Sequence, residues 1–157
     1  METSTSSSVS TLNELVLINN DRVAGYEKAL EEINAKDATA TGNLVSLFNN
    51  YLSDSKRFSN ELAAQVQAEG GEVETGTMVS GKLFRAWMDV KALFTGKDTH
   101  AILASCETGE DAAQRAYQSA LGEEDLSSTA REIILRQQAD LKRAHDQIKL
   151  LRDRSKD

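Results

Sequence analysis

Two ionisable residues of this 157-residue chain stand where helix periodicity predicts a hydrophobic core. Glu110 comes four residues after Cys106, and His145 comes four residues after Leu141 and three before Ile148. A buried carboxylate or imidazole costs several kcal/mol unless it is paired, hydrogen-bonded or bound to a metal. These two residues therefore indicate either a buried hydrogen-bonded layer or a binding site.

Other acidic residues fall at a similar height on the helices that the sequence predicts. Counting residues from the predicted turns places all candidate metal ligands in the middle third of a helical bundle. Carboxylates and imidazole together suit iron and other divalent transition metals. The candidate ligands are Glu107, Glu110, His145, Asp21 and Asp54. The chain has no nucleophile elbow, phosphate-binding loop or cofactor motif, so we expect no catalytic residue and no organic cofactor, and we favour a protein that is not an enzyme.

Hydrophobic residues at spacings of three and four predict four long helices. Capping-box spacing places the start of the first near Ser10 or Thr11, and residues 1–9 are expected to form a disordered lead. Gly70-Gly71 is a strong C-terminal signal for the second helix. The predicted long helices cover about residues 10–35, 43–69, 98–122 and 127–152, and a shorter amphipathic helix is predicted at about 79–94.

The connections between these helices define a topology. Two short turns make two antiparallel helix pairs, and the long connection at about 70–98 lets the third long helix start at the same end as the second. That is the ferritin-like arrangement. We predict an all-α fold, a ferritin-like four-helix bundle with an extra short helix in the long crossover between helices 2 and 3, and one domain over residues 10–157.

Ferritin-like di-iron centres use inward carboxylates together with Glu-x-x-His pairs. This chain has no Glu-x-x-His, because Lys142 stands three residues before His145 and the other histidine is His100. Two interpretations stay open. One is an incomplete carboxylate and histidine site formed by Glu107, Glu110 and His145. The other, which we favour, is a structural layer in which Glu107 or Glu110 satisfies His145.

The charge and hydropathy of the chain limit its partners. A net charge of −7 and a pI of about 4.9 lack the basic footprint of a nucleic-acid binder. No apolar stretch approaches the about 18 residues of a membrane span, and the first residues lack the pattern of a secretory signal. We therefore expect no nucleic-acid partner, no membrane partner and a cytoplasmic location. A single cysteine excludes an intramolecular disulfide.

Several stretches also match the pattern of a known family. They are Gly81 to Lys91, Ala101 to Leu103, Glu107 to Asp111, Tyr117, Ala120-Leu121 and His145-Asp146. Over about residues 10–152 the chain resembles an uncharacterised bacterial four-helix-bundle family of the ferritin-like superfamily, domain of unknown function 2383. The resemblance implies a ferritin-like bundle and no established activity.

Two classes of function fit these observations. The first, which we favour, is a non-catalytic, stress-associated bundle that acts by protein association. The second is a metal-binding ferritin-like protein that holds iron in an incomplete carboxylate and histidine site at the bundle centre. The crossover helix can leave Phe84, Trp87 and Phe94 in an exposed apolar patch, so we predict a homodimer or a higher oligomer.

Overall fold

The computed structural model describes residues 2–34, 42–74 and 99–154. These ranges contain α1 (Glu2–Asn34), α2 (Gly42–Ala68), α4 (Thr99–Leu121) and α5 (Ser128–Arg154), and they contain no strand. The all-α prediction is confirmed. The short helix predicted at about 79–94, with its apolar patch, lies outside the described residues.

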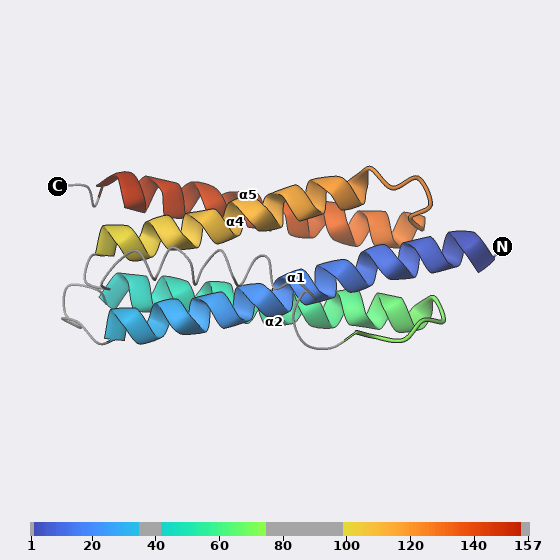
Figure 1. Cartoon of the computed structure of the whole chain (residues 1–157), viewed down its shortest axis with the longest axis horizontal. Helices are drawn as coiled ribbons and strands as arrows, with labels where there is room; N and C mark the ends of the chain where they lie inside the picture. Colours follow the sequence, from blue (N-terminus) through green and yellow to red (C-terminus); the bar gives the residue numbers. More distant parts are fainter. Residues whose placement is uncertain (1, 35–41, 75–98, 155–157) are drawn as a thin grey trace.

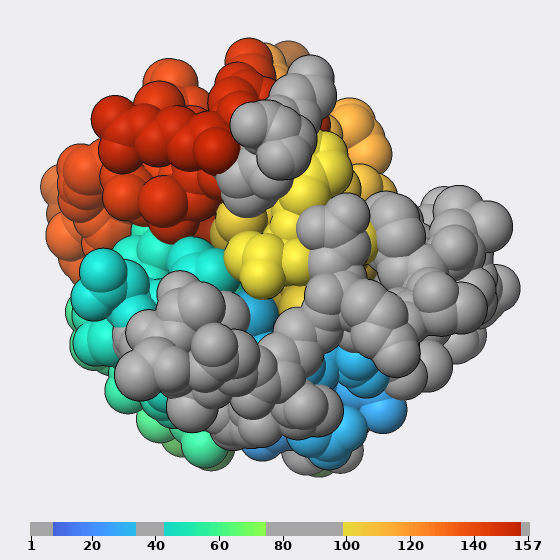
Figure 2. Space-filling model, turned by 90° about the vertical axis from the view of Figure 1, so that its left-hand side faces the viewer, coloured from blue at the N-terminus to red at the C-terminus, as the bar shows by residue number. Residues whose placement is uncertain are grey.

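The four helices run along one common axis (Figure 1). α1 runs against α2, α4 runs against α5, and α2 and α4 both begin at the left-hand end of the view. α1 packs on α2 and α4, and α5 packs on α4 and α2. Figure 2 looks onto that end, with red α5 beside cyan α2 and yellow α4 beside blue α1. The shared direction of α2 and α4 confirms the predicted ferritin-like topology.

Apolar side chains at helical spacing fill the interior in two clusters. Their fully buried members include Leu12, Leu62 and Ile134 in the first cluster, and Ile33, Phe48 and Ile148 in the second. Burying a side chain of this size stabilises the fold by about 1.5–3 kcal/mol. On α1 and α2, buried polar side chains occupy positions between the two clusters. None of the described helices is long and apolar enough to cross a membrane.

The Gly70-Gly71 pair ends α2, as predicted. Gly70 has a φ of +85°, and its N–H donates to the carbonyl of Gln67 at 3.0 Å. The N–H of Gly71 donates to the carbonyl of Val66 at 2.9 Å, which completes a Schellman motif. A Cβ at Gly71 would collide with the side chain of Val9, so the second glycine allows α1 to approach closely.

The first helix differs from the prediction at its N-terminal end. α1 begins at Glu2, whereas we expected a disordered lead over residues 1–9. The side chain of Ser8 is only 2% exposed, and its hydroxyl oxygen accepts a hydrogen bond from the backbone N–H of Ser127 at 3.3 Å. Contacts with residues far along the chain therefore stabilise the part of α1 that precedes its predicted start.

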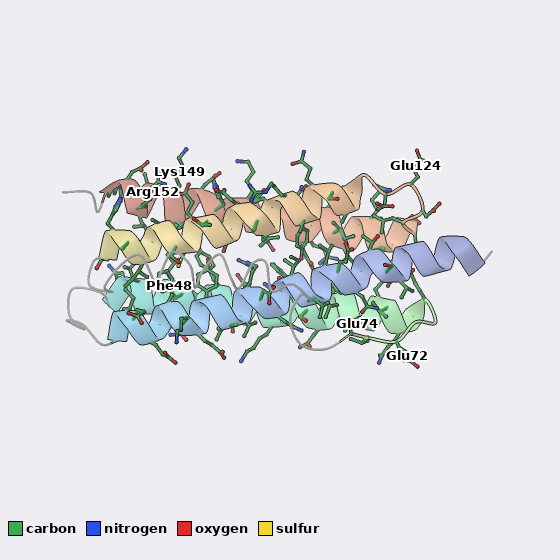
Figure 3. The ribbon with its side chains drawn as sticks, in the orientation of Figure 1. Phe48, Glu72, Glu74, Glu124, Lys149 and Arg152 are labelled. Carbon is green, nitrogen blue, oxygen red and sulfur yellow. The ribbon has the colours of Figure 1, made fainter. Side chains whose placement is uncertain are left out.

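The side chain of Asn13 fastens the first residues of the crossover to α1. Its amide nitrogen donates to the carbonyl of Glu72, and its amide oxygen accepts from the N–H of Glu74, both at 2.9 Å. Figure 3 shows Glu72 and Glu74 at this end of the bundle, with Lys149 and Arg152 of α5 toward the opposite end. The crossover thus leaves α2 along α1 before the described range ends at residue 74.

Candidate functional site

The centre of the bundle holds a buried ion pair. Nη2 of Arg22 on α1 lies 2.6 Å from Oε2 of Glu110 on α4, and the two side chains are 1% and 0% exposed. Tyr26, one turn further along α1, donates its hydroxyl hydrogen to the same carboxylate oxygen. Nη1 of Arg22 donates to the hydroxyl of Ser55 on α2 at 2.8 Å. We call Arg22, Tyr26, Ser55 and Glu110 the central layer.

The Arg22 guanidinium and the buried Tyr26 and Cys106 beside it keep their protons at neutral pH. Burial alone would lower the pKa of Arg22, but the negative charge of Glu110 and the neighbouring Tyr26 raise it above the ordinary arginine value. Burial, and then the charge of Glu110, raises the pKa of Tyr26 well above its ordinary value. The same two causes raise the pKa of Cys106. The arginine therefore stays charged, and the phenol and the thiol stay protonated.

A second set of polar side chains crosses all four helices next to the central layer. The Asn19 amide donates to the hydroxyl of Tyr117 at 2.8 Å, and that hydroxyl donates to the Gln137 amide oxygen at 2.6 Å. Gln137 in turn donates to Glu61 at 2.9 Å, and Glu61 pairs with Arg136 at 2.7 Å. This chain of hydrogen bonds joins α1, α4, α5 and α2, and it reaches solvent at Glu61 and Arg136, whose side chains are 32% and 59% exposed.

Four buried polar atoms belonging to or near these two sets of side chains have no hydrogen-bond partner among the described residues. They are Oδ1 of Asn19, Nε of Arg22, Oε1 of Glu110 and Nε2 of Gln114. All four side chains come from α1 and α4, which pack on each other. Two of these atoms are acceptors and two are donors. One buried water molecule donates two hydrogen bonds and accepts two, so its capacity matches these four atoms.

A different group of ionisable side chains lies between α4 and α5. Nε2 of His145 is 2.7 Å from Oδ1 of Asp111 and 3.7 Å from Oε2 of Glu107. Arg152 pairs with the other oxygen of Glu107, and Nδ1 of His145 is 3.2 Å from Oδ1 of Asp146. The His145 side chain is 20% exposed and that of Asp111 is 46% exposed, so this group is open to solvent.

The five predicted ligands do not converge on one centre. Glu107 and His145 lie together, as expected, but Glu110 is engaged by Arg22 and Tyr26 instead of by His145. The remaining two are apart from that pair. Asp21 is fully buried on α1, and Asp54 pairs with Arg57 of α2 at 2.8 Å with its side chain 39% exposed.

Sequence reasoning missed Arg22 and Asp111. The positional signal for Arg22 was present, because it comes three residues after Asn19 and four before Tyr26. Val23, four residues after Asn19, fits the same helical spacing, and it is half-buried. Asp111 stands four residues after Glu107 and so shares its helix face, but nothing in the sequence says that His145 lies opposite.

Comparison with known proteins supports the fold. The family model described as Domain of unknown function (DUF2383) matches residues 7–123. A solved structure of a Dps1 point mutant from Mycobacterium smegmatis is similar, with a TM-score of 0.81 and 12% identity over 96% of this chain and 97% of that chain. At that identity the likeness shows the fold alone. No curated protein matches the sequence.

Proposed function

The chain belongs to the DUF2383 family, and we propose that it is a non-catalytic ferritin-like bundle that acts through protein association, in the first place with copies of itself. A ferritin-like fold serves unrelated activities, so the proposal rests on side chains and not on the fold. The observation that carries it is the ion pair of the central layer.

The positive charge at the centre of the bundle comes from the protein itself. In ferritin-like di-metal proteins, inward carboxylates and histidines hold metal ions inside the bundle. Here the guanidinium of Arg22 lies among the inward side chains and neutralises Glu110 at 2.6 Å. A metal ion bound by Glu110 would strand a buried cation, which is strongly unfavourable. The central layer therefore favours a structural role.

The interior offers no activated nucleophile within the described residues. Cys106 is 0% exposed, and burial raises the pKa of its thiol, so the reactive thiolate is suppressed. Tyr26 is equally buried and donates its hydrogen to Glu110. Neither side chain meets solvent, which supports a protein without chemistry at its centre.

The outer surface of α5 supports the association. Leu135 is 50% exposed and Leu150 is 44% exposed, and they are the large exposed apolar side chains of the described residues. They are separated by four helical turns, about 22 Å along one side of the helix. Burying such side chains against a second copy would remove apolar surface from water.

The alternative function is iron binding at the bundle centre by the five predicted ligands. It requires Glu110 and Asp54 to face a shared cation. Glu110 instead faces Arg22, and Asp54 pairs with Arg57. These placements disfavour a central iron site, and the alternative becomes one outcome of the experiment below.

The test measures metal content, Fe(II) oxidation and oligomeric state of the untagged protein. We expect no metal that depends on Glu110, and a mass in light scattering that rises with concentration. The Leu135→Gln/Leu150→Gln variant should associate less, with Ala64→Gln, at an exposed residue of α2, as the matched control. Stoichiometric iron that is lost in Glu110→Gln would overturn the structural interior. A monomer at every concentration would overturn self-association.

A further inference from the structure

His145 has carboxylates on both sides of its ring. Nδ1 lies 3.2 Å from Asp146, which belongs to the same helix. Nε2 lies 2.7 Å from Asp111 and 3.7 Å from Glu107, which both come from α4. A neutral imidazole carries one N–H and one lone pair, so it can donate to only one of these sides. The other side then sets a lone pair against carboxylate oxygens, unless the ring takes up a second proton or a cation lies between them.

We infer that Glu107, Asp111 and His145 bind one divalent transition-metal ion, a site that goes beyond the proposed function. One ligand atom from each residue lies within 4.8 Å of the other two. Ligands bound at about 2.0–2.2 Å to a shared cation stand about 3.0–3.5 Å apart for octahedral or tetrahedral angles. The observed separations of 2.7 Å and 3.7 Å bracket that range, so small rotamer adjustments close the site.

The neighbours of the three ligands hold them in place for this role. Nδ1 of His145 lies 3.2 Å from Oδ1 of Asp146, and in the tautomer that carries its hydrogen on Nδ1 this contact directs the Nε2 lone pair toward α4. Arg152, labelled on α5 in Figure 3, pairs with Oε1 of Glu107 and leaves Oε2 facing His145. Outer partners of this kind fix the tautomer of the imidazole and the rotation of the carboxylate.

The donor set and the exposure select the class of ion. One imidazole with two carboxylates suits zinc, iron(II), cobalt(II) or nickel(II), whereas calcium and magnesium prefer oxygen ligands alone. The Asp111 side chain is 46% exposed, so water molecules can fill the remaining coordination positions. The group uses no residue of the central layer, because Glu107 pairs with Arg152 and Glu110 pairs with Arg22.

The experiment titrates the untagged full chain with Zn²⁺ and Co²⁺, using calorimetry and the visible spectrum of bound cobalt. We expect one ion per chain, and affinity at least about tenfold weaker in Glu107→Gln, Asp111→Asn and His145→Gln, since even the loss of an outer partner costs about 10–100-fold. Glu132→Gln, an exposed carboxylate of α5, is the matched control. Glu110→Gln should bind the ion as wild type does, which separates this site from a central one.

A measurement on the wild-type chain does not depend on how the variants fold. The chain has two histidines, and His100 lies in the first turn of α4 with Nδ1 near the carbonyl of Arg152. Zn²⁺, which is diamagnetic, should shift the ring signals of His145 and leave those of His100 in place. Absence of binding at millimolar Zn²⁺, equal losses in Glu132→Gln and the three ligand variants, or shifts confined to His100 would each overturn the site.

Discussion

Arg22 of α1 and Glu110 of α4 form an ion pair of 2.6 Å that is almost completely shielded from water. The same guanidinium reaches Ser55 of α2 at 2.8 Å, and the Ser55 hydroxyl donates to the carbonyl of Tyr51 at 2.8 Å. The side chain of Arg22 therefore connects α1, α2 and α4 at one level of the bundle. Because each partner is buried, neither charge can be removed without stranding the other.

We predict that breaking this pair from one side destabilises the bundle strongly. Glu110→Gln leaves the Arg22 guanidinium buried without its counter-charge and should lower the free energy of unfolding by about 3–5 kcal/mol. The double variant Arg22→Met/Glu110→Gln should lose far less than Arg22→Met and Glu110→Gln together, because no charge is stranded. Urea unfolding followed by circular dichroism measures all the variants, and the double-mutant cycle gives the coupling.

The exposed pair of Asp54 and Arg57 is the matched control. Its charged atoms lie at a similar distance of 2.8 Å, but the side chains are 39% and 59% exposed. Arg57→Met should therefore cost about 1 kcal/mol or less. Additive effects of the Arg22 and Glu110 substitutions would contradict the buried pair.

Much of the fold could be predicted because its signals are local. Apolar residues three and four apart define the helices, and Gly70-Gly71 marks the end of α2. The early start of α1 could not be predicted, because serine and threonine are weak helix formers and the stabilising contact of Ser8 comes from Ser127, 119 residues away.

The partners in the interior were predictable only in part. Glu110 was identified as buried from its spacing, and Glu107 was one of the two partners predicted for His145. Arg22 was not, because arginine is rarely fully buried and both Arg22 and Val23 continue the helical series. Only the carboxylate of Glu110, 88 residues further along the chain, makes the buried position of Arg22 favourable.

An internal water molecule is the second prediction. Oδ1 of Asn19 and Oε1 of Glu110 are buried acceptors, and Nε of Arg22 and Nε2 of Gln114 are buried donors, all without partners in the described part of the chain. A leftover buried polar atom costs about 1–3 kcal/mol, and a water that binds several such atoms removes that cost. We expect a long-lived water signal next to the Gln114 amide in nuclear magnetic resonance, and its loss in Gln114→Leu. An amide that exchanges with bulk solvent alone would contradict this.

The third prediction concerns the Asn13 clamp, by which we mean the two hydrogen bonds from the Asn13 side chain to the backbone of residues 72 and 74. Asn13→Ala removes both hydrogen bonds to residues 72 and 74 and should lower the free energy of unfolding by about 1–3 kcal/mol. Asn13→Asp keeps the oxygen that accepts from the Glu74 N–H and loses the donor to the Glu72 carbonyl, so the Glu74 amide should stay protected. Hydrogen exchange at that amide distinguishes the two variants. Equal exchange in both would show that the clamp does not hold residue 74.

The last prediction is an alkaline unfolding step controlled by tyrosine. Burial, followed by the charge of Glu110, raises the pKa of Tyr26 well above its ordinary value and that of Tyr51 to about 12, and burial raises the pKa of Tyr117 as well. A group whose folded pKa is raised contributes stability that is complete below its unfolded pKa, about 10 for tyrosine, and is lost as the pH rises through the folded value.

The chain has three tyrosines, so tyrosinate absorbance should appear together with the loss of helical circular dichroism above about pH 10. Tyr51 is the least buried of the three, so Tyr51→Phe should remove the earliest part of the absorbance change and leave the rest coupled to unfolding. Complete ionisation near pH 10 with the helices intact would contradict the burial of Tyr26 and Tyr117.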